Sequence, residues 1–452
     1  MTLPPGTRTL ASAVVGALLA GLLSGLASPT ASAATTAHRL HAGDTVYRHH
    51  SVHVRRSFFG LHDGSMQAYG HLPFGSIRLW DAHVSWADIE TAPGVYDWSR
   101  LDQLVTAAQN HHVQVTLVLA MTPSFYAASQ SQPPSDPEAY ARFVRAVMTR
   151  YRNFNGRRGI AAYQVWNEPN ISYFWTGTPA QMAQLTAVVD HVRDEVDPRA
   201  TVVAPSFAVR LRYQRVWMSA YQHQDTADGL PVWRHYDVNA LSLYPRPQYG
   251  RYDGGPEDAM RLLGKARRVL NRAGVPGDKK IWATEINYGV TGGGLADASA
   301  QPISQRRQVA NVLRTYLLGA ANGLSHIFWY RYDWGRIAGG GTLGNTLLTD
   351  PDDFARVQDA GRALRIAEHW LRGRLVGTDG HRPCHESRDG TYACTVRRHG
   401  VARTIYWNPH HNVRIHVPRA VYRTMVDGRL VARHATSRTV RVTYRPVIVR
   451  GR

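Results

Sequence analysis

The sequence predicts an α/β protein: a (β/α)8 TIM barrel followed by a small C-terminal antiparallel β domain. The chain has 452 residues, of which 44% are apolar, so it can bury the core of one large domain and a smaller one. Eight apolar runs alternate with amphipathic helical patterns between residues 57 and 330, and this alternation predicts parallel strands closed into a barrel. An open doubly wound sheet is the alternative, but no glycine-rich phosphate loop follows the first run.

The predicted strands are short runs rich in β-branched and aromatic residues. They lie at residues 57–62, 76–81, 113–120, 160–167, 200–206, 238–244, 280–286 and 324–330. The clearest helical segments between them span residues 136–151, 178–196, 255–274 and 303–323. Ser135 or Asp136 can cap the first of these helices, and Pro137 suits its first turn. Asn322-Gly323 is a fitting stop for the fourth.

The pattern changes from about residue 373. Short alternating runs such as RTIYWNP (403–409) and VRIHVP (413–418) are separated by turn residues, which predicts antiparallel strands. We therefore assign residues 35–370 to the barrel and residues 371–452 to a basic, β-sandwich-like C-terminal domain. No low-complexity linker separates the two, so we expect the small domain to pack directly on the barrel.

The first 34 residues differ from the rest of the chain. Arg8 precedes an apolar run at residues 11–27, and Ala-Ser-Ala at 31–33 fits a small-residue cleavage site. The apolar run has about 17 residues, which is short for a membrane span. We predict a secretory signal peptide over residues 1–34, no membrane span after its removal, and a secreted, extracellular protein, with cell-wall association left open.

The only two cysteines are Cys384 and Cys394. In an oxidising compartment, two cysteines ten residues apart most simply form a disulfide. His381 and His385 lie close by and raise the alternative of zinc, but the stretch lacks the Cys-x-x-Cys spacing of a structural zinc site. The spacing favours a disulfide over a metal.

Positive charge is concentrated at the C-terminus. The formal net charge is +20, and residues 371–452 carry 17 arginines against four acidic residues. Only three of the 53 basic residues are lysine, a bias typical of GC-rich bacterial genomes. Nucleic acid is the usual partner of such basicity, but export argues against it. An anionic cell-wall or extracellular polymer is the better prediction for a partner, while a solvated surface that only aids solubility and charge complementarity to the barrel stay open as alternatives.

Two glutamates terminate predicted strands. Among the eight glutamates of the chain, only Glu168 in YQVWNEPN and Glu285 in IWATEINYG have this position. The carboxyl ends of barrel strands carry the chemistry of this fold. Two carboxylates that face one cavity are what cleavage of a glycosidic bond requires, one as a proton donor and one as an anion.

These motifs carry a resemblance to a known group of enzymes. YQVWNEPN (163–170), IWATEINYG (281–289) and GSIRLWDAHVSWADIETAPGVYDWSRLD (75–102) resemble clan A of the glycoside hydrolases, in particular family 39 and the related family 5. The resemblance covers about residues 57–335. It implies a retaining hydrolase that cleaves an extracellular or cell-wall polysaccharide or oligosaccharide by double displacement and requires no metal or organic cofactor.

The resemblance also implies roles for individual residues. Glu168 would be the acid/base and Glu285 the nucleophile. Asn167 would bind the sugar 2-hydroxyl, and Arg78 would hold Glu285 ionised. Trp329 would form the floor of the sugar subsite.

One departure from the family pattern lies in the sixth strand. The family commonly has His-x-Tyr there, whereas this chain has Ser242-Leu243-Tyr244, so Tyr244 can still orient the nucleophile but the imidazole is missing. His62 and Asp63 after the first strand are further candidate substrate contacts. The aromatic residues 173–175 can either stack on sugar rings or pack over the barrel mouth.

Two other functions stay open. A non-catalytic carbohydrate-binding or cell-wall-binding protein could keep the barrel cleft, but glutamates at both strand ends favour an enzyme. A transglycosylase would use the same residues and differ only in the acceptor.

Overall fold

The structure is a computed structural model that describes most of the chain beyond residue 50. The described residues are 51–245, 254–289, 303–331, 348–350, 353–376, 383–398, 401–416, 421–426, 429–433 and 439–450. The predicted signal peptide lies outside them. Among the described residues, every helix is too short or too polar to cross a membrane.

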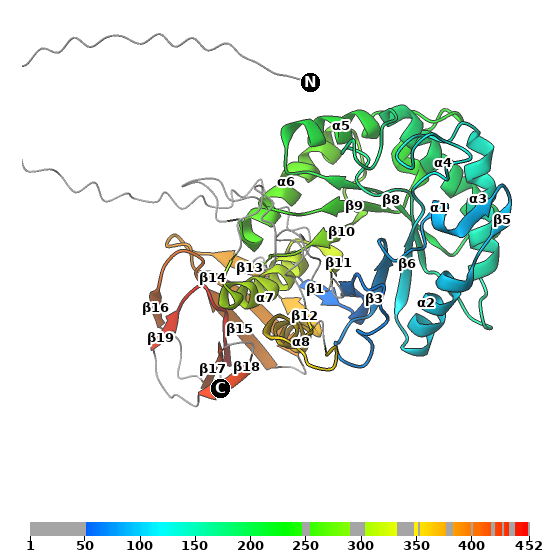
Figure 1. Cartoon of the computed structure of the whole chain (residues 1–452). Helices are drawn as coiled ribbons and strands as arrows, with labels where there is room; N and C mark the ends of the chain where they lie inside the picture. Colours follow the sequence, from blue (N-terminus) through cyan, green and yellow to red (C-terminus); the bar gives the residue numbers. More distant parts are fainter. Residues whose placement is uncertain are drawn as a thin grey trace, which may run out of the picture. The chain divides into compact units, whose positions relative to one another are not determined.

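Eight parallel strands close into a barrel, which confirms the predicted fold class (Figure 1). In order around the barrel, they are β2 (Phe59–Leu61), β3 (Ser76–Leu79), β6 (Gln114–Val118), β7 (Ala162–Gln164), β8 (Thr201–Ala208), β9 (Val238–Ser242), β10 (Lys280–Ile286) and β11 (Leu324–Trp329). Pairing of β11 with β2, which sets Ile327 opposite Phe59, closes the barrel. Each strand overlaps one of the eight predicted runs.

Helices follow seven of the eight strands. They are α2 (Ser99–Asn110), α3 (Pro137–Tyr151), α4 (Pro179–Val196), α5 (Arg212–Gln222), α6 (Pro256–Arg272), α7 (Gln305–Ala321) and α8 (Asp359–Leu371). The side chain of Asp136 caps α3 by accepting from the backbone N–H of Glu138, so Asp136 rather than Ser135 is the N-cap. Residues 62–75, between β2 and β3, form turns and loops instead of a helix.

A short segment with its own small elements connects β3 to α2. It contains the single-turn helix α1 (Trp86–Ile89) and a small hairpin of β4 (Glu90–Ala92) and β5 (Val95–Tyr96). Two 3-10 turns, η1 (Arg56–Phe58) and η2 (Val232–His235), precede β2 and β9. Ser85 and Asp88 form a reciprocal capping box that fixes the start of α1.

The barrel interior has its own apolar layer. The cluster consists of strand residues Ala162, Val203, Val238, Ala240, Trp282 and Phe328, separate from the larger core that includes the helices. Side chains alternate between the two faces of a strand, so the neighbours of these residues point outward to the helices. Phe328 therefore faces the barrel interior and Trp329 faces the helix layer.

The C-terminal part is antiparallel, as predicted. One sheet has the order β1 (Ser51–Val54), β12 (Gly373–Val376), β14 (Tyr392–Arg398), β15 (Val401–Trp407), β20 (Val447–Arg450), β17 (Val421–Val426) and β18 (Arg429–Arg433), with β13 (Cys384–Glu386) paired to β14. A second, two-stranded sheet joins β16 (Val413–His416) and β19 (Thr439–Val442). The strand Ser51–Val54 pairs with β12 in the first sheet, although it lies in the range that the sequence assigns to the barrel.

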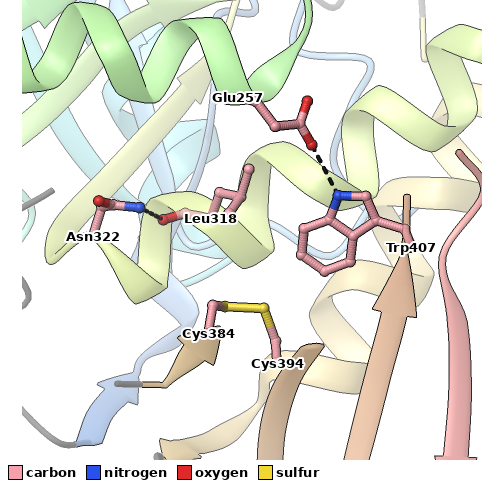
Figure 2. The surroundings of a disulfide bond; sticks show 6 residues. All are labelled: Glu257, Leu318, Asn322, Cys384, Cys394 and Trp407. Carbon is pink, nitrogen blue, oxygen red and sulfur yellow. Dashed lines mark hydrogen bonds between the residues drawn. A yellow bond between two sulfur atoms is a disulfide. The ribbon is translucent and has the colours of Figure 1, made fainter. Parts of the chain in front are cut away.

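The predicted disulfide between Cys384 and Cys394 is confirmed (Figure 2). The two residues are direct partners on the antiparallel strands β13 and β14, with Cα atoms 4.1 Å apart. The bond therefore crosslinks a strand pair that β-sheet hydrogen bonds already hold in register.

The C-terminal sheet packs directly on the barrel helices, as predicted from the lack of a linker. In Figure 1, α7 and α8 lie beside this sheet, and one hydrophobic core runs from the barrel to Trp407. The indole N–H of Trp407 donates to Oε1 of Glu257 on α6 at 2.9 Å (Figure 2). The ring of Tyr392 stacks on Trp407 with centroids 4.9 Å apart. Because this hydrogen bond is buried, separating its partners would leave polar groups unpaired. It therefore favours this one arrangement of the C-terminal sheet on the barrel helices.

We expect Trp407→Phe to lower the free energy of unfolding by about 1–3 kcal/mol, because the buried carboxylate of Glu257 loses a hydrogen-bond donor. Urea denaturation followed by circular dichroism measures this change. Tyr406→Phe on the same strand is the control and should change the value by less than about 0.5 kcal/mol. Equal effects of the two variants would contradict a specific role for the Trp407 contact.

Candidate active site

A cavity of about 890 Å³ opens at the carboxyl ends of the barrel strands. Its lining combines carboxylates, arginines, amides and aromatic rings. The carboxylates include Glu168, Glu285 and Asp81, and the aromatic residues are Trp80, Tyr173, Phe174, Tyr244, Tyr288 and Tyr330. Both glutamates that the sequence singled out therefore face the same cavity.

Glu168 lies immediately beyond β7 in an uncommon backbone conformation. Its φ of +40° is unfavourable for a residue with a side chain. The segment is held next to β8 by a hydrogen bond from the Ser206 N–H to the Trp166 carbonyl, and Pro169 prevents the strand from continuing. The neighbouring structure thus forces the Glu168 side chain, 8% exposed, to the cavity wall.

Glu285 is held by a donor on each carboxylate oxygen. It lies on β10 with 5% of its surface exposed. Nη1 of Arg78 donates to Oε1 at 2.8 Å, and the hydroxyl of Tyr244 donates to Oε2 at 3.0 Å. Both interactions favour the ionised form and fix the orientation of the carboxylate.

Arg78, on β3, lies behind the cavity lining and holds polar side chains of the site in place by hydrogen bonds. It is fully buried and does not line the cavity. Besides Glu285, its guanidinium donates to Gln164 at 2.7 Å and to Oδ1 of Asn167 at 2.8 Å. The Nδ2 of Asn167 has no partner among the described residues, and Asn167 lines the cavity. This amide can therefore donate to a ligand.

The two carboxyl groups differ in proton affinity. Burial, and then the charge of Glu285, raises the pKa of Glu168 to about 8. Burial also raises the pKa of Glu285, but the Arg78 cation and the Tyr244 hydroxyl oppose this rise. Two buried carboxylates that repel one another share a single proton, and the ion pair places the negative charge on Glu285. The Arg78 cation and the Tyr244 hydroxyl therefore favour the negative charge on Glu285 and the shared proton on Glu168.

Trp329 is not the cavity floor that the resemblance implied. Its side chain is 0% exposed and packs in the layer between strands and helices. Alternation along the strand instead turns the next residue, Tyr330, into the cavity, where its hydroxyl donates to Asp81 at 2.5 Å. The prediction for Trp329 is wrong by one residue.

His62 and Asp63 are not among the described residues that line the cavity, so their contact with substrate stays a prediction. Oδ1 and Oδ2 of Asp63 accept four hydrogen bonds from donors of its own loop, two of them from Ser65. His62 is buried, and burial lowers its pKa, so the neutral ring donates from Nε2 to the Thr284 carbonyl at 2.9 Å. Its ring packs edge-on against Tyr330, with centroids 4.9 Å apart. Both residues support the wall behind the cavity.

The structure adds cavity residues that the sequence analysis did not select. Arg210 lies beyond β8, which extends two residues past the predicted strand end, and its charge lowers the pKa of Glu168. Of the aromatic residues 173–175, Tyr173 is 77% exposed and lines the cavity with Phe174. Trp175 is instead buried against the ring of Trp166.

No protein-family model and no curated protein sequence matches the chain. Solved structures do match it. A family 39 glycoside hydrolase from the gut symbiont Bacteroides cellulosilyticus WH2 aligns with a TM-score of 0.60 and 15% identity, over 88% of this chain and 82% of that one. The GH39 enzyme from Xanthomonas axonopodis pv. citri aligns with a TM-score of 0.59 and 15% identity, over 89% and 95%. A monomeric β-xylosidase from Caulobacter crescentus CB15 aligns with a TM-score of 0.59 and 13% identity, over 88% of this chain and 97% of that one.

The chain has the fold of the clan A glycoside hydrolases. The alignments span both the barrel and most of the remaining chain, so the likeness is not confined to a barrel that many unrelated proteins share. At this level of identity the likeness establishes the fold, and the chemistry has to be argued from the site.

We expect Glu285→Gln to lower the pKa of Glu168 toward the ordinary range of a glutamate, because removing the nearby negative charge stabilises the Glu168 carboxylate. Infrared difference spectra of the protonated carboxyl band, recorded across the pH range, measure the pKa. Glu195→Gln, at an exposed position of α4, is the control: Glu168 should keep its raised pKa. An unchanged pKa in Glu285→Gln would mean that the two groups do not interact.

Proposed function

We propose that the protein is a secreted, retaining glycoside hydrolase that acts on an extracellular or cell-wall polysaccharide or oligosaccharide. One observation carries the proposal: two glutamates face the same cavity at the carboxyl ends of the barrel strands, and among the described residues only Glu285 of the two is paired with a buried arginine. Glycosidic cleavage with retention requires a combination of one acid and one nucleophilic carboxylate. The fold shared with glycoside hydrolases supports it.

The first step forms a covalent intermediate. The ionised carboxylate of Glu285 attacks the anomeric carbon while Glu168 gives its proton to the departing glycosidic oxygen. The bond from the anomeric carbon to that oxygen breaks as the bond to Glu285 forms. Tyr244 and Arg78 keep the attacking carboxylate oriented and ionised up to this point.

The second step restores the enzyme. Glu168, now ionised, takes a proton from a water molecule that attacks the anomeric carbon, and the bond to Glu285 breaks. The sugar leaves with its original configuration because each step inverts the anomeric carbon once. Double displacement uses only the two carboxylates and water, so the proposed reaction requires no metal or organic cofactor.

Other cavity residues fit the recognition of a sugar. The unpartnered Nδ2 of Asn167 can donate to a sugar hydroxyl next to the reacting carbon. The rings of Tyr173, Phe174 and Tyr330 offer apolar faces on which a sugar ring can stack. A transglycosylase would use the same groups, and a sugar acceptor in place of water would distinguish it.

The decisive experiment removes the nucleophile. Glu285→Ala should lower turnover of aryl glycosides by at least about 1,000-fold, because no covalent intermediate can form. Azide should restore activity and give a glycosyl azide of inverted configuration, since the small anion fits the space of the lost carboxylate. Product configuration is measured by nuclear magnetic resonance.

Glu168→Gln is the matched variant. It should slow substrates with poor leaving groups by about 100-fold to 10,000-fold, yet spare the first step for activated aryl glycosides that need no proton. Rescue of Glu285→Ala with retained configuration, or equal loss for both leaving groups in Glu168→Gln, would overturn the assignment. A wild-type protein that binds sugars without turnover would identify a binding protein instead.

A basic β-ribbon in the C-terminal domain supports a second, separate proposal. Arg414 on β16 and Arg441 on β19 are direct cross-strand partners, and both are exposed. Like charges placed opposite one another destabilise a strand pair. The other face of the ribbon packs Val440 and Val442 into a small apolar cluster, so the arginines remain on the outer face.

We infer that this basic ribbon binds an anionic cell-wall or extracellular polymer and keeps the exported protein near its substrate. An anionic chain would relieve the repulsion between the two arginines. Exposed charges act over about 8–10 Å at moderate salt, so a repeating anionic polymer can engage several arginines of the domain together. Export through the N-terminal segment is part of the same proposal.

Arg414→Ser combined with Arg441→Ser should weaken co-sedimentation of the protein with isolated cell walls at low salt. Wild-type binding should itself decline as salt approaches about 0.5 M, because screening shortens the range of the charges. Arg199→Ser combined with Arg212→Ser removes the same charge from exposed barrel positions and is the control. Equal binding by the two double variants, or binding that ignores salt, would exclude anchoring through the ribbon.

A further inference from the structure

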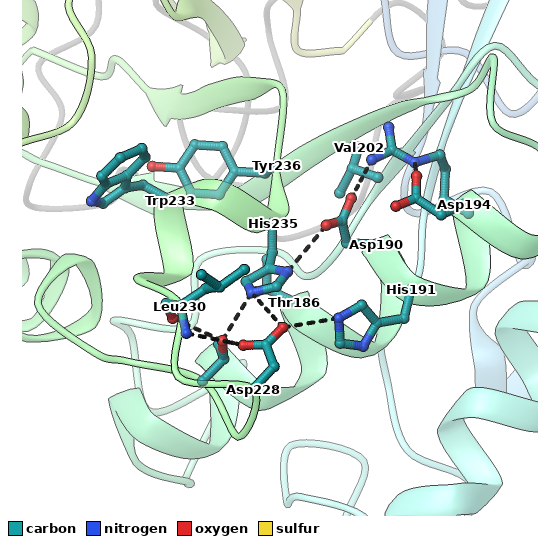
Figure 3. Close-up of polar contacts among 12 residues, drawn as sticks. Thr186, Asp190, His191, Asp194, Val202, Asp228, Leu230, Trp233, His235 and Tyr236 are labelled. Carbon is teal, nitrogen blue, oxygen red and sulfur yellow. Dashed lines mark hydrogen bonds and ion pairs between the residues drawn. The ribbon is translucent and has the colours of Figure 1, made fainter.

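Two histidines and an aspartate converge in one cluster (Figure 3). His191 lies near the end of α4, His235 ends the 3-10 turn before β9, and Asp228 lies in the loop between α5 and that turn. These positions precede the strands β8 and β9, so they belong to the amino-terminal ends of the barrel strands. The cavity lies at the carboxyl ends.

The spacing of the three ligand atoms fits a tetrahedral metal ion. Oδ2 of Asp228 lies 3.1 Å from Nε2 of His191 and 3.4 Å from Nε2 of His235, and all three atoms lie within 4.8 Å of one another. In a tetrahedron with zinc–ligand bonds of about 2.0–2.2 Å, ligand atoms are about 3.3–3.6 Å apart. Small side-chain shifts would complete the geometry.

The surrounding residues orient the ligand atoms. Nδ1 of His235 lies 3.1 Å from the carboxylate of Asp190, which holds a proton on Nδ1 and leaves Nε2 as the nitrogen available to an ion. Arg193 binds the other oxygen of Asp190. A carboxylate behind a histidine is the usual support of a metal ligand in proteins.

Asp228 presents a single oxygen to the histidines. Its Oδ1 accepts from the hydroxyl of Thr226 at 2.6 Å and from the N–H of Leu230 at 3.1 Å, which leaves Oδ2 for the ion. The same hydroxyl oxygen lies 2.8 Å from Nε2 of His235, so a bound ion would replace that contact. His191 and Asp228 are solvent-accessible, which gives an ion a path of entry and a water as fourth ligand.

The geometry points to a Zn²⁺ site formed by His191, Asp228 and His235. Two imidazoles and one carboxylate suit zinc, whereas Ca²⁺ prefers six to eight oxygen ligands. The ion would tie α4 to the segment Thr226–His235 and so stabilise the base of the barrel. Its distance from the cavity makes it independent of the proposed glycosidase reaction.

The test uses the full chain without a polyhistidine tag, freed of metal with EDTA. Calorimetric titration with Zn²⁺ should show one site in the wild-type protein, and Zn²⁺ should raise its thermal unfolding midpoint. His191→Ala, an exposed change that leaves the buried His235 in place, should lower the affinity at least about tenfold and remove the thermal shift. Co²⁺ should give the strong visible absorption of a tetrahedral site with the wild type but not with His191→Ala.

His223→Ala, another exposed histidine at the end of the neighbouring helix α5, is the control and should bind Zn²⁺ like the wild type. Asp228→Asn should repeat the loss seen in His191→Ala. No Zn²⁺ binding by the wild type, equal binding by wild type and His191→Ala, or binding of Ca²⁺ but not Zn²⁺ would each overturn the proposal. Activity toward glycosides does not enter any of these readouts.

Discussion

The geometry of the cavity depends on one buried guanidinium. Arg78 carries a full charge inside the barrel, where desolvation costs several kcal/mol unless the charge is paired and hydrogen-bonded. Three acceptors on two other strand ends, Gln164, Asn167 and Glu285, meet its planar donors at 2.7–2.8 Å. The same contacts fix the Asn167 amide that faces the cavity and favour the ionised form of Glu285, so they favour the proton of the pair on Glu168.

The missing histidine of the sixth strand has a structural counterpart in a layer of hydroxyl groups. Ser242 stands at the position of that histidine, and its hydroxyl lies 3.0 Å from that of Ser206, which in turn lies 2.7 Å from that of Thr284. Ser242 also hydrogen-bonds Glu168 and lowers its pKa against the larger effect of burial. A small polar layer thus replaces a titratable ring beside Glu168, and Tyr244, just beyond this strand, hydrogen-bonds the carboxylate of Glu285.

The sequence by itself determined the features that arise from local patterns. Strand and helix periodicity, with caps such as Asp136, indicated eight repeating units, and the change of pattern near residue 373 indicated the antiparallel sheet. The disulfide followed from the presence of only two cysteines, and its residues proved to be cross-strand partners. Glu168 and Glu285 could be selected because a glutamate at the end of an apolar strand is rare and both strand ends point to one face.

Only the tertiary structure decided which neighbouring residue faces the cavity and which distant residues meet. Consecutive strand residues point to opposite faces, so barrel register places Tyr330 rather than Trp329 at the cavity. Asp63 accepts four hydrogen bonds from its own loop, and no sequence spacing distinguishes such a loop anchor from a ligand contact. The strand Ser51–Val54 joins a sheet whose next strand lies more than 300 residues away, and the ring of His191 contacts that of His235. Both contacts form only when the fold brings distant segments together, so the local pattern of residues does not predict them.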